Sequence, residues 1–119
     1  MRKNVLREKS FGFAVRVVNL FKYLCAKKKE FVLSKQVLRS GTSVGAMVRE
    51  SEYAESKKDF VHKMAIAQKE INETLYWLEL LNATEYISTK EYENLSADAV
   101  EIIKMITSSI KTAKRVIND

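Results

Sequence analysis

The sequence predicts an all-α protein, an up-down-up-down antiparallel four-helix bundle formed by a single domain over residues 1–119. Three observations support this fold class. The chain contains no proline and only three glycines, although sheets and long loops usually need such residues at their turns. Nearly half of the residues (46%) are apolar, which is enough for a core. Apolar residues recur at spacings of three and four in four long segments with short connections, which makes sequence neighbours antiparallel.

The first helix is expected over residues 8–29, and it has two apolar stripes instead of one. One stripe is Phe11, Ala14, Val18, Phe21 and Cys25, and the other is Phe13, Val17, Leu20 and Leu24. A helix that packs within one bundle needs only one such face. The second stripe therefore predicts that this helix also contacts another subunit.

The second helix is expected over residues 34–50, with Ser34 as its N-cap. It contains the stretch RSGTSVGAM, in which Gly41 and Gly45 lie four residues apart. A phosphate-binding loop of the Walker type needs a preceding strand and a closing Gly-Lys-Ser/Thr, and neither is present. Two glycines at this spacing share one helical face, where another backbone can approach. We therefore expect close helix packing at both glycines, with a ligand-binding loop as the alternative.

Capping boxes mark the start of the two remaining helices. Ser56–Asp59 precedes a helix expected over 57–81, and Ser88–Glu91 precedes one over 89–117. Each helix has one apolar stripe at helical spacing. The stripes are Phe60, Met64, Ala67, Ile71, Leu75, Leu78 and Leu81, and Tyr92, Leu95, Ala99, Ile102, Ile106, Ile110, Ala113 and Ile117.

The net charge of +6 is distributed unevenly along the chain. Residues 1–39 hold eleven Lys and Arg against two acids, residues 40–103 hold six against twelve, and residues 104–119 hold four against one. The positive charge therefore belongs to the two ends of the chain. This distribution predicts an anionic partner, with nucleic acid as the first candidate.

The bundle topology brings both chain ends to one pole. The basic residues predicted to bind nucleic acid there are Arg2, Lys3, Arg7, Lys9, Lys111, Lys114 and Arg115. Lys27, Lys28 and Lys29 lie at the opposite pole, where the first helix is expected to end. Two interpretations of this run stay open. The lysines contact nucleic acid, or they are favoured by the helix dipole alone.

The pattern of titratable residues does not indicate catalysis or a metal site. Asp59-x-x-His62 contains the only histidine, and a di-iron site in a helical bundle needs two Glu-x-x-His pairs. Glu70 and Glu73 share a helical face, and we expect them to pair with Arg39 or Arg49 of the neighbouring helix. We predict that the protein is not an enzyme and needs no cofactor or metal.

The remaining candidates for chemistry have structural explanations. Cys25 lies in an apolar stripe and is expected to be a small core residue. As a single cysteine it excludes an internal disulfide and favours a reducing, cytoplasmic location. The sequence contains no run of 18 apolar residues, so it predicts no membrane span. Tyr76 and Trp77 could form a platform for bases, although such residues more often belong to a core or an interface.

The segment from Lys35 to Leu81 resembles a known family. It is similar to the four-helix-bundle proteins encoded by intervening sequences in bacterial 23S rRNA genes, and to the accessory variability proteins of diversity-generating retroelements. The family usually has Asn at the position of Met47. The residues that occupy matching places are Gln36, Arg39, Ser43, Gly45, Glu50, Asp59, Phe60, Ala67 and Glu73.

The resemblance implies a four-helix bundle that assembles into a ring-like homo-oligomer, commonly a homopentamer. It implies no enzymatic activity, and it implies nucleic acid as the main partner. In the retroelement branch it implies a reverse transcriptase as partner. The alternative function is a protein-interaction adaptor or scaffold without a direct role in nucleic-acid binding.

Overall fold

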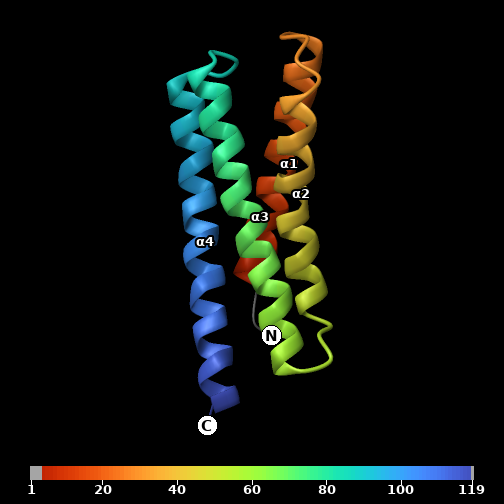
Figure 1. Cartoon of the computed structure of the whole chain (residues 1–119), viewed down its shortest axis with the longest axis vertical. Helices are drawn as coiled ribbons and strands as arrows, with labels where there is room; N and C mark the ends of the chain where they lie inside the picture. The colour runs from red at the N-terminus through yellow and green to blue at the C-terminus, as the bar shows by residue number, and fades with distance from the viewer. Residues whose placement is uncertain (1–3, 119) are drawn as a thin grey trace.

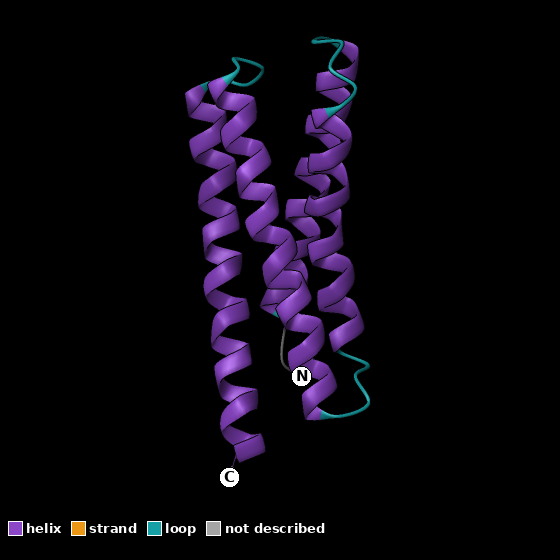
Figure 2. Cartoon of the chain, in the orientation of Figure 1, coloured by secondary structure: helices purple, strands orange, loops and turns teal. Residues whose placement is uncertain are grey.

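The computed structural model describes the backbone of residues 4–118 and the side chains of residues 4–116. Arg2 and Lys3, two of the predicted nucleic-acid ligands, lie outside the described residues. This part of the chain is all-helical, with four α-helices and no strand (Figure 2). The helices are α1 Val5–Ala26, α2 Leu33–Ser51, α3 Lys57–Ala83 and α4 Thr89–Asn118.

Each helix runs antiparallel to its neighbour in the sequence (Figure 1). Helix α4 ends at the bottom of the view, which we call the lower pole, with the α2–α3 turn nearby, and α1 begins above them in the lower half of the rod. The α1–α2 and α3–α4 turns lie at the opposite end, the upper pole. The rod that results measures 51 × 26 × 21 Å.

Helix α1 is shifted toward the N-terminus from the predicted range of 8–29. It starts at Val5 because the Asn4 side chain accepts a hydrogen bond from the Arg7 backbone N–H at 2.9 Å. It ends at Ala26 because Lys29 adopts a left-handed backbone conformation, with φ of 55°. The predicted range placed three lysines inside the helix, and the structure places them beyond it.

Helix α2 is capped by Glu30, so the prediction of Ser34 as N-cap was wrong. The Glu30 carboxylate accepts hydrogen bonds from the backbone N–H of Val32 at 3.3 Å and of Ser34 at 2.7 Å. A carboxylate at this position satisfies free N–H groups and complements the positive end of the helix dipole. Ser34 instead lies inside the first turn of α2 and is fully buried.

The predicted capping box is complete at α4, whereas at α3 only the hydrogen bond to the capping serine is present. Ser88 Oγ accepts from the Glu91 N–H at 3.1 Å, and Glu91 Oε1 accepts from the Ser88 N–H at 3.4 Å. Ser56 Oγ accepts from the Asp59 N–H at 3.0 Å, whereas the Asp59 carboxylate accepts from the N–H of Glu55 at 3.1 Å. These caps fix where the two longest helices begin.

The core consists of two apolar clusters separated by a polar contact. The lower cluster includes Phe13, Val44 and Ile71, and the upper cluster includes Leu24 and Leu78. Between them, Thr74 Oγ1 of α3 lies 2.8 Å from Ser40 Oγ of α2, and both residues are fully buried. Because buried hydroxyls are costly when unpaired, this contact fixes the register of α2 against α3.

Only one of the two apolar stripes of α1 enters the core. Phe13, Val17, Leu20 and Leu24 are buried, together with Leu6 and Ser10. In the other stripe Phe11 is 57% exposed and the remaining members are half-buried. The described residues therefore cover this apolar strip on α1 only in part.

Candidate nucleic-acid interface

The two predicted cations of α1 each lie beside an acid. Arg7 Nε is 3.6 Å from Glu52 Oε2, and Lys9 Nζ is 2.8 Å from Glu101 Oε1. The hydrogen bond from Lys9 to Glu101 and the charge of that carboxylate raise the pKa of Lys9. An adjacent carboxylate reduces the attraction of each cation for a phosphate.

The three predicted cations of α4 lie nearer its end. The Lys9–Glu101 ion pair shows that these two residues of α1 and α4 lie at the same height along the bundle. Lys111 follows Glu101 by ten residues, which corresponds to about 15 Å along the helix, and Lys114 and Arg115 lie further still. The structure therefore keeps these three cations apart from the α1 cations, although all of them belong to the lower half of the bundle (Figure 1).

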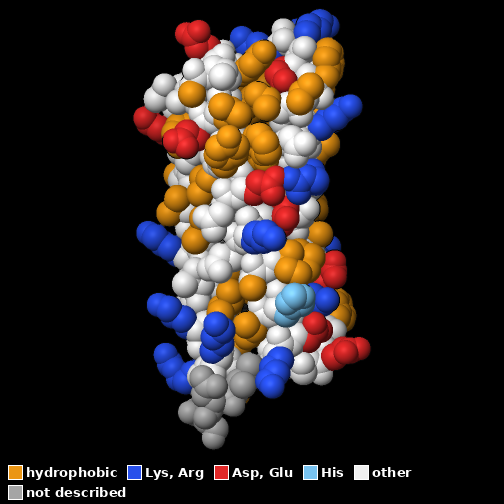
Figure 3. Space-filling view, viewed as in Figure 1, with side chains coloured by type: hydrophobic (Ala, Val, Ile, Leu, Met, Phe, Trp, Pro, Cys, Tyr) orange, Lys and Arg blue, Asp and Glu red, His pale blue; other side chains and the backbone are white. Residues whose placement is uncertain are grey.

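A continuous basic strip follows the second half of α4. We define the α4 basic strip as Lys104, Lys111, Lys114 and Arg115. All four side chains are exposed, and within residues 4–116 none of them forms an ion pair. Figure 3 shows Lys and Arg gathered over the lower half of this face.

Hydroxyl side chains accompany the cations of the α4 basic strip. Thr107, Ser108 and Thr112 line, together with three of the cations, a hollow of about 360 Å³. Thr107 Oγ1 also accepts a hydrogen bond from Gln68 Nε2 at 3.0 Å, which ties the strip to α3. Lysine, arginine and hydroxyl groups are the side chains that contact phosphate and sugar oxygens in protein–nucleic-acid complexes. Sequence analysis did not include Lys104 or these hydroxyls, although their spacing of three and four residues along α4 was a usable signal.

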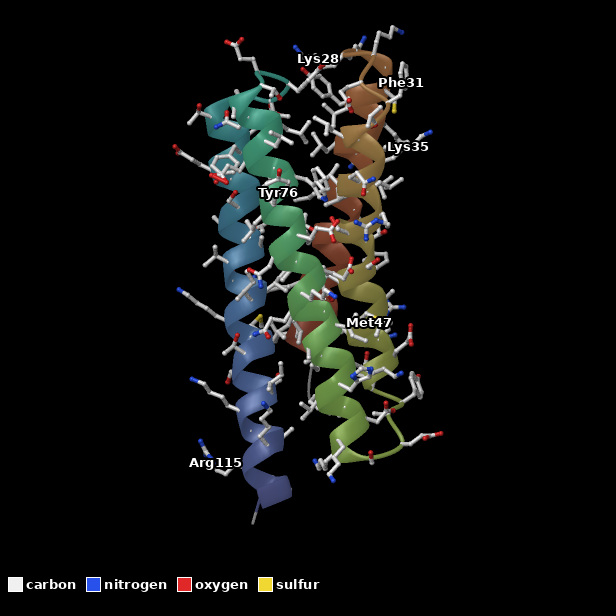
Figure 4. All side chains as sticks on the ribbon, viewed as in Figure 1. Lys28, Phe31, Lys35, Met47, Tyr76 and Arg115 are labelled. Atoms are coloured by element: carbon white, nitrogen blue, oxygen red, sulfur yellow. The ribbon has the colours of Figure 1, made fainter. Side chains whose placement is uncertain are left out.

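At the upper pole, Lys27, Lys28 and Lys29 lie in the α1–α2 turn, and Lys35 lies in the first turn of α2. We call Lys27, Lys28, Lys29 and Lys35 the upper lysine group, and all four are exposed (Lys28 and Lys35 are labelled in Figure 4). Glu30 is the only acid of this turn. It is 9% exposed, and its carboxylate is directed inward to cap α2. The outer surface of the turn therefore presents cations without an accessible carboxylate.

Two further lysines open α3 at the lower pole. Lys57 and Lys58 are exposed residues of the first helical turn. The N-terminus of a helix carries a partial positive charge, so lysines at this end do not stabilise α3 through the helix dipole. Asp59 in the same turn offsets part of that cost.

Gly41 and Gly45 face α1 across a short distance. A Cβ atom on Gly41 would lie 2.8 Å from both γ-carbons of Val17, and one on Gly45 would lie 3.3 Å from the backbone oxygen of Ser10. Both contacts are shorter than ordinary van der Waals contact. Neither glycine has a positive φ, and both are helical, so the segment is not a phosphate-binding loop.

Arg39 joins α2 to the carboxylates of α3. Its guanidinium lies 3.3 Å from Glu70 Oε2 and also pairs with Glu73. Trp77 Nε1 donates to Glu73 Oε2 at 2.8 Å, and this hydrogen bond, followed by those from Arg39, lowers the pKa of Glu73. Of the two partners expected for these carboxylates, Arg39 pairs with both. Arg49 instead lies over the Phe11 ring, 5.5 Å from its centroid.

The candidates for other chemistry are not assembled into a site. Trp77 packs half-buried against the upper core, and Tyr76 beside it is exposed (Figure 4). Cys25 Sγ lies 3.7 Å from Ser34 Oγ. Within the described chain, no group of three or more His, Cys, Asp and Glu side chains is arranged to hold a metal ion. None of the four described helices has the length and apolar character that a membrane span requires.

These features define a class of protein: a four-helix chain with exposed, unpaired cations at both poles of its described part. The chain belongs to the 23S rRNA-intervening sequence protein family, which it matches over residues 2–108. Among curated proteins, none matches this chain.

A solved structure with the same fold comes from Bacteroides thetaiotaomicron VPI-5482. It is a crystal structure at 1.70 Å resolution of a protein with unknown function from the S23 ribosomal protein family. The two sequences are 57% identical, the TM-score is 0.89, and the match covers 90% of this chain and 99% of that chain. The similarity supports the family membership.

Proposed function

We propose that this chain is a non-enzymatic, oligomeric protein that binds nucleic acid through the α4 basic strip and the upper lysine group. The observation that supports the proposal is that the cations of these two surfaces are not paired with acids, whereas several cations elsewhere are. The exposed cations of these two surfaces have no ion-pair partner in the described residues, whereas Arg7, Lys9 and Arg39 are paired with acids. The description of the family as 23S rRNA-intervening sequence protein supports RNA as the nucleic acid.

The proposed binding is electrostatic and depends little on base sequence. Lysine, arginine and hydroxyl groups on an exposed helix contact phosphates and sugars, which carry no sequence information. Each neutralised phosphate releases counterions, so the logarithm of the affinity falls linearly with the logarithm of the salt concentration.

The proposal includes a ring-like homo-oligomer, and a homopentamer by family resemblance. A ring requires two different, complementary faces on each subunit. The chain exposes two separate sets of large apolar residues that fit this requirement. One set is Phe11 and Val15 on α1, and the other is Phe31, Val32 and Tyr76 on the α1–α2 turn and α3.

Oligomerisation strengthens the proposed binding by repetition. Exposed charges are screened within about 10 Å at ordinary salt concentrations, so one α4 basic strip binds a polyanion weakly. A ring repeats the strip once per subunit around one rim. After the first contact, each further contact occurs at a high effective concentration, which raises the total affinity without any new type of contact.

The exposed apolar residues also favour a second candidate function, that of a protein-interaction adaptor. In this case the α1 strip or the Tyr76 region receives another protein, such as a reverse transcriptase, and the lysines only keep the protein soluble. The two candidates differ in a direct way, because an adaptor has no affinity for isolated nucleic acid.

Fluorescence anisotropy with a labelled 20-base-pair RNA duplex tests the proposal, with mass from light scattering measured on the same sample. We expect binding at 50 mM salt by an oligomer several times larger than the 13.7 kDa chain, with a marked loss of affinity at 200 mM salt. An intact oligomer that does not bind duplex or single-stranded RNA at 50 mM salt would contradict the proposal and favour the adaptor.

A further inference from the structure

An open hollow that sequence analysis did not anticipate lies between the two turns of the upper pole. Its volume is about 550 Å³. Tyr23 in α1 and Lys28 in the α1–α2 turn line one side. Asn82 and Tyr86 line the other, at the end of α3 and in the α3–α4 turn. We call this space the upper hollow. No sequence spacing could reveal it, because its walls come from segments about sixty residues apart in the chain.

The walls of the upper hollow combine aromatic rings with free hydrogen-bonding groups. Tyr23 is 38% exposed, and Tyr86 packs half-buried against the upper core, so both present ring surface at the hollow. Asn82 Oδ1 accepts a hydrogen bond from Thr89 Oγ1 at 3.3 Å, which orients the amide. The Asn82 Nδ2 group has no partner among the described residues and can donate into the hollow.

This combination suits an unpaired nucleobase. Bases of single-stranded nucleic acid stack on aromatic side chains, and their edges accept and donate hydrogen bonds to side-chain amides. The volume lies within the range of about 300–1,000 Å³ typical of small-molecule sites. A base in a duplex cannot enter such a space, because both of its faces and its pairing edge are occupied.

The charges around the upper hollow are divided between its two sides. Lys28 borders the α1 side, and Glu30, the only acid of the α1–α2 turn, is directed inward. Glu85 and Glu91 border the α3–α4 side. Phosphates are therefore attracted to the lysine side. On the other side the Glu85 carboxylate is available to accept from base amino groups, whereas Glu91 Oε1 already accepts from Ser88.

We propose that the upper hollow receives one unpaired base of a single-stranded nucleic acid. In this arrangement Tyr23 stacks on the base, Asn82 contacts its edge, and Lys28 contacts the adjoining phosphate. The inference rests on the proposed function and assigns a separate task to each pole. The α4 basic strip binds single and double strands alike, whereas the upper hollow favours single strands.

The test uses a fluorescein-labelled single-stranded RNA of about 12 nucleotides, its duplex, and the same strand carrying 2-aminopurine, whose fluorescence falls on stacking. The variants are Tyr23→Leu, Tyr23→Phe and the control Tyr53→Leu, an 84% exposed tyrosine of the lower pole. We expect Tyr23→Leu to weaken single-strand binding by about fivefold to a hundredfold and to abolish the 2-aminopurine quenching. Tyr23→Phe keeps both properties, and duplex affinity is the same in all variants.

The other outcomes separate this inference from the proposed function. If Tyr23→Leu binds both RNAs like the wild type, or if Tyr53→Leu loses as much affinity, the inference about the hollow is wrong and the proposed function stands. The inference is also wrong if Tyr23→Leu changes the mass of the oligomer, because Tyr23 is then a subunit contact. Absence of wild-type binding to either RNA at 50 mM salt would overturn the proposed function itself.

Discussion

Gly41 of α2 lies so close to Val17 of α1 that a Cβ atom at Gly41 would be 2.8 Å from both γ-carbons of Val17. Val17 is fully buried and β-branched, so it has few alternative rotamers and no free space into which to move. One turn further along α2, Gly45 approaches the backbone of Ser10. The distance between α1 and α2 therefore depends on the absence of side chains at both positions.

The first prediction compares two Gly→Ala substitutions. Alanine is the better helix former by about 0.5–1 kcal/mol. At Gly12 of α1 no atom lies within 4 Å of the new Cβ, so Gly12→Ala should raise the free energy of unfolding by about that amount. Gly41→Ala should lower it by about 1–3 kcal/mol, because Val17 must shift within a packed core. Urea unfolding measures both, and a stabilisation by Gly41→Ala would show that the α1–α2 contact is looser than described.

The spacing of apolar residues was sufficient to predict the four helices, because each has a stripe that the core buries. Val17, Ile71 and Ala99 lie in predicted stripes and are fully buried. The start of α2 could not be predicted in the same way. Glu30 reaches its N–H groups only because Lys29 adopts a left-handed conformation, and nothing in the local sequence demands a positive φ at a lysine.

The sequence was sufficient to predict which segments carry an excess of basic residues. It was not sufficient to predict which of these residues lie together or stay unpaired. Lys111 and Arg115 were found from composition alone. Which lysines stay unpaired depends on the register of α1 against α4, set by contacts such as Lys9 with Glu101, more than ninety residues apart. The upper hollow depends on how two distant turns meet, which helical periodicity does not describe.

The second prediction concerns the hydroxyl pair between the two core clusters. Thr74→Val keeps the shape of the side chain and leaves the buried Ser40 hydroxyl without its partner. We expect a loss of about 1–3 kcal/mol in the free energy of unfolding. The double variant Ser40→Ala/Thr74→Val should lose less than the sum of the two single variants, because no polar group is then left unpaired. Additive losses in a double-mutant cycle would contradict the contact.

The third prediction is a pH dependence that arises from Glu73. Its pKa is lowered by the hydrogen bond from Trp77 and then by Arg39, so the folded state favours the carboxylate. The resulting stabilisation is complete above the ordinary carboxyl pKa of about 4.3 and is lost as the pH falls through the lowered value. Glu73→Gln should therefore be less stable than the wild type at pH 7 and should show a shallower loss of stability with acid.

Trp77 provides a direct measurement of this titration, because it is the only tryptophan of the chain. Its emission should change as Glu73 becomes protonated in the folded protein and should stay constant in Glu73→Gln. Glu79→Gln, at an exposed carboxylate of the same helix, is the matched control. An identical emission titration in wild type and Glu73→Gln would contradict the assigned hydrogen bond.

The fourth prediction tests the proposed ring. Val15 of α1 is 45% exposed and belongs with Phe11 to one proposed subunit face, whereas Val100 of α4 is 42% exposed and lies outside both proposed faces. Val15→Glu places a charge in the subunit contact and should weaken assembly at least tenfold, because an unpaired charge resists burial. Val100→Glu should leave the mass unchanged. Light scattering over a range of protein concentrations measures the mass of both variants. Equal masses would show that Val15 does not lie in a subunit contact.

The salt dependence of RNA binding distinguishes a phosphate-binding surface on α4 from lysines and arginines that are only solvated. The triple variant Lys111→Gln/Lys114→Gln/Arg115→Gln removes three cations of the α4 basic strip, and Lys22→Gln/Lys69→Gln/Lys90→Gln removes three exposed cations elsewhere. Anisotropy titrations with an RNA duplex at several salt concentrations give the slope of log affinity against log salt. Each phosphate contact contributes about 0.9 to this slope. We predict a clearly shallower slope for the first variant only, with unchanged thermal melting in both. Equal slopes for the wild type and both variants would contradict the assignment of the α4 basic strip as a nucleic-acid surface.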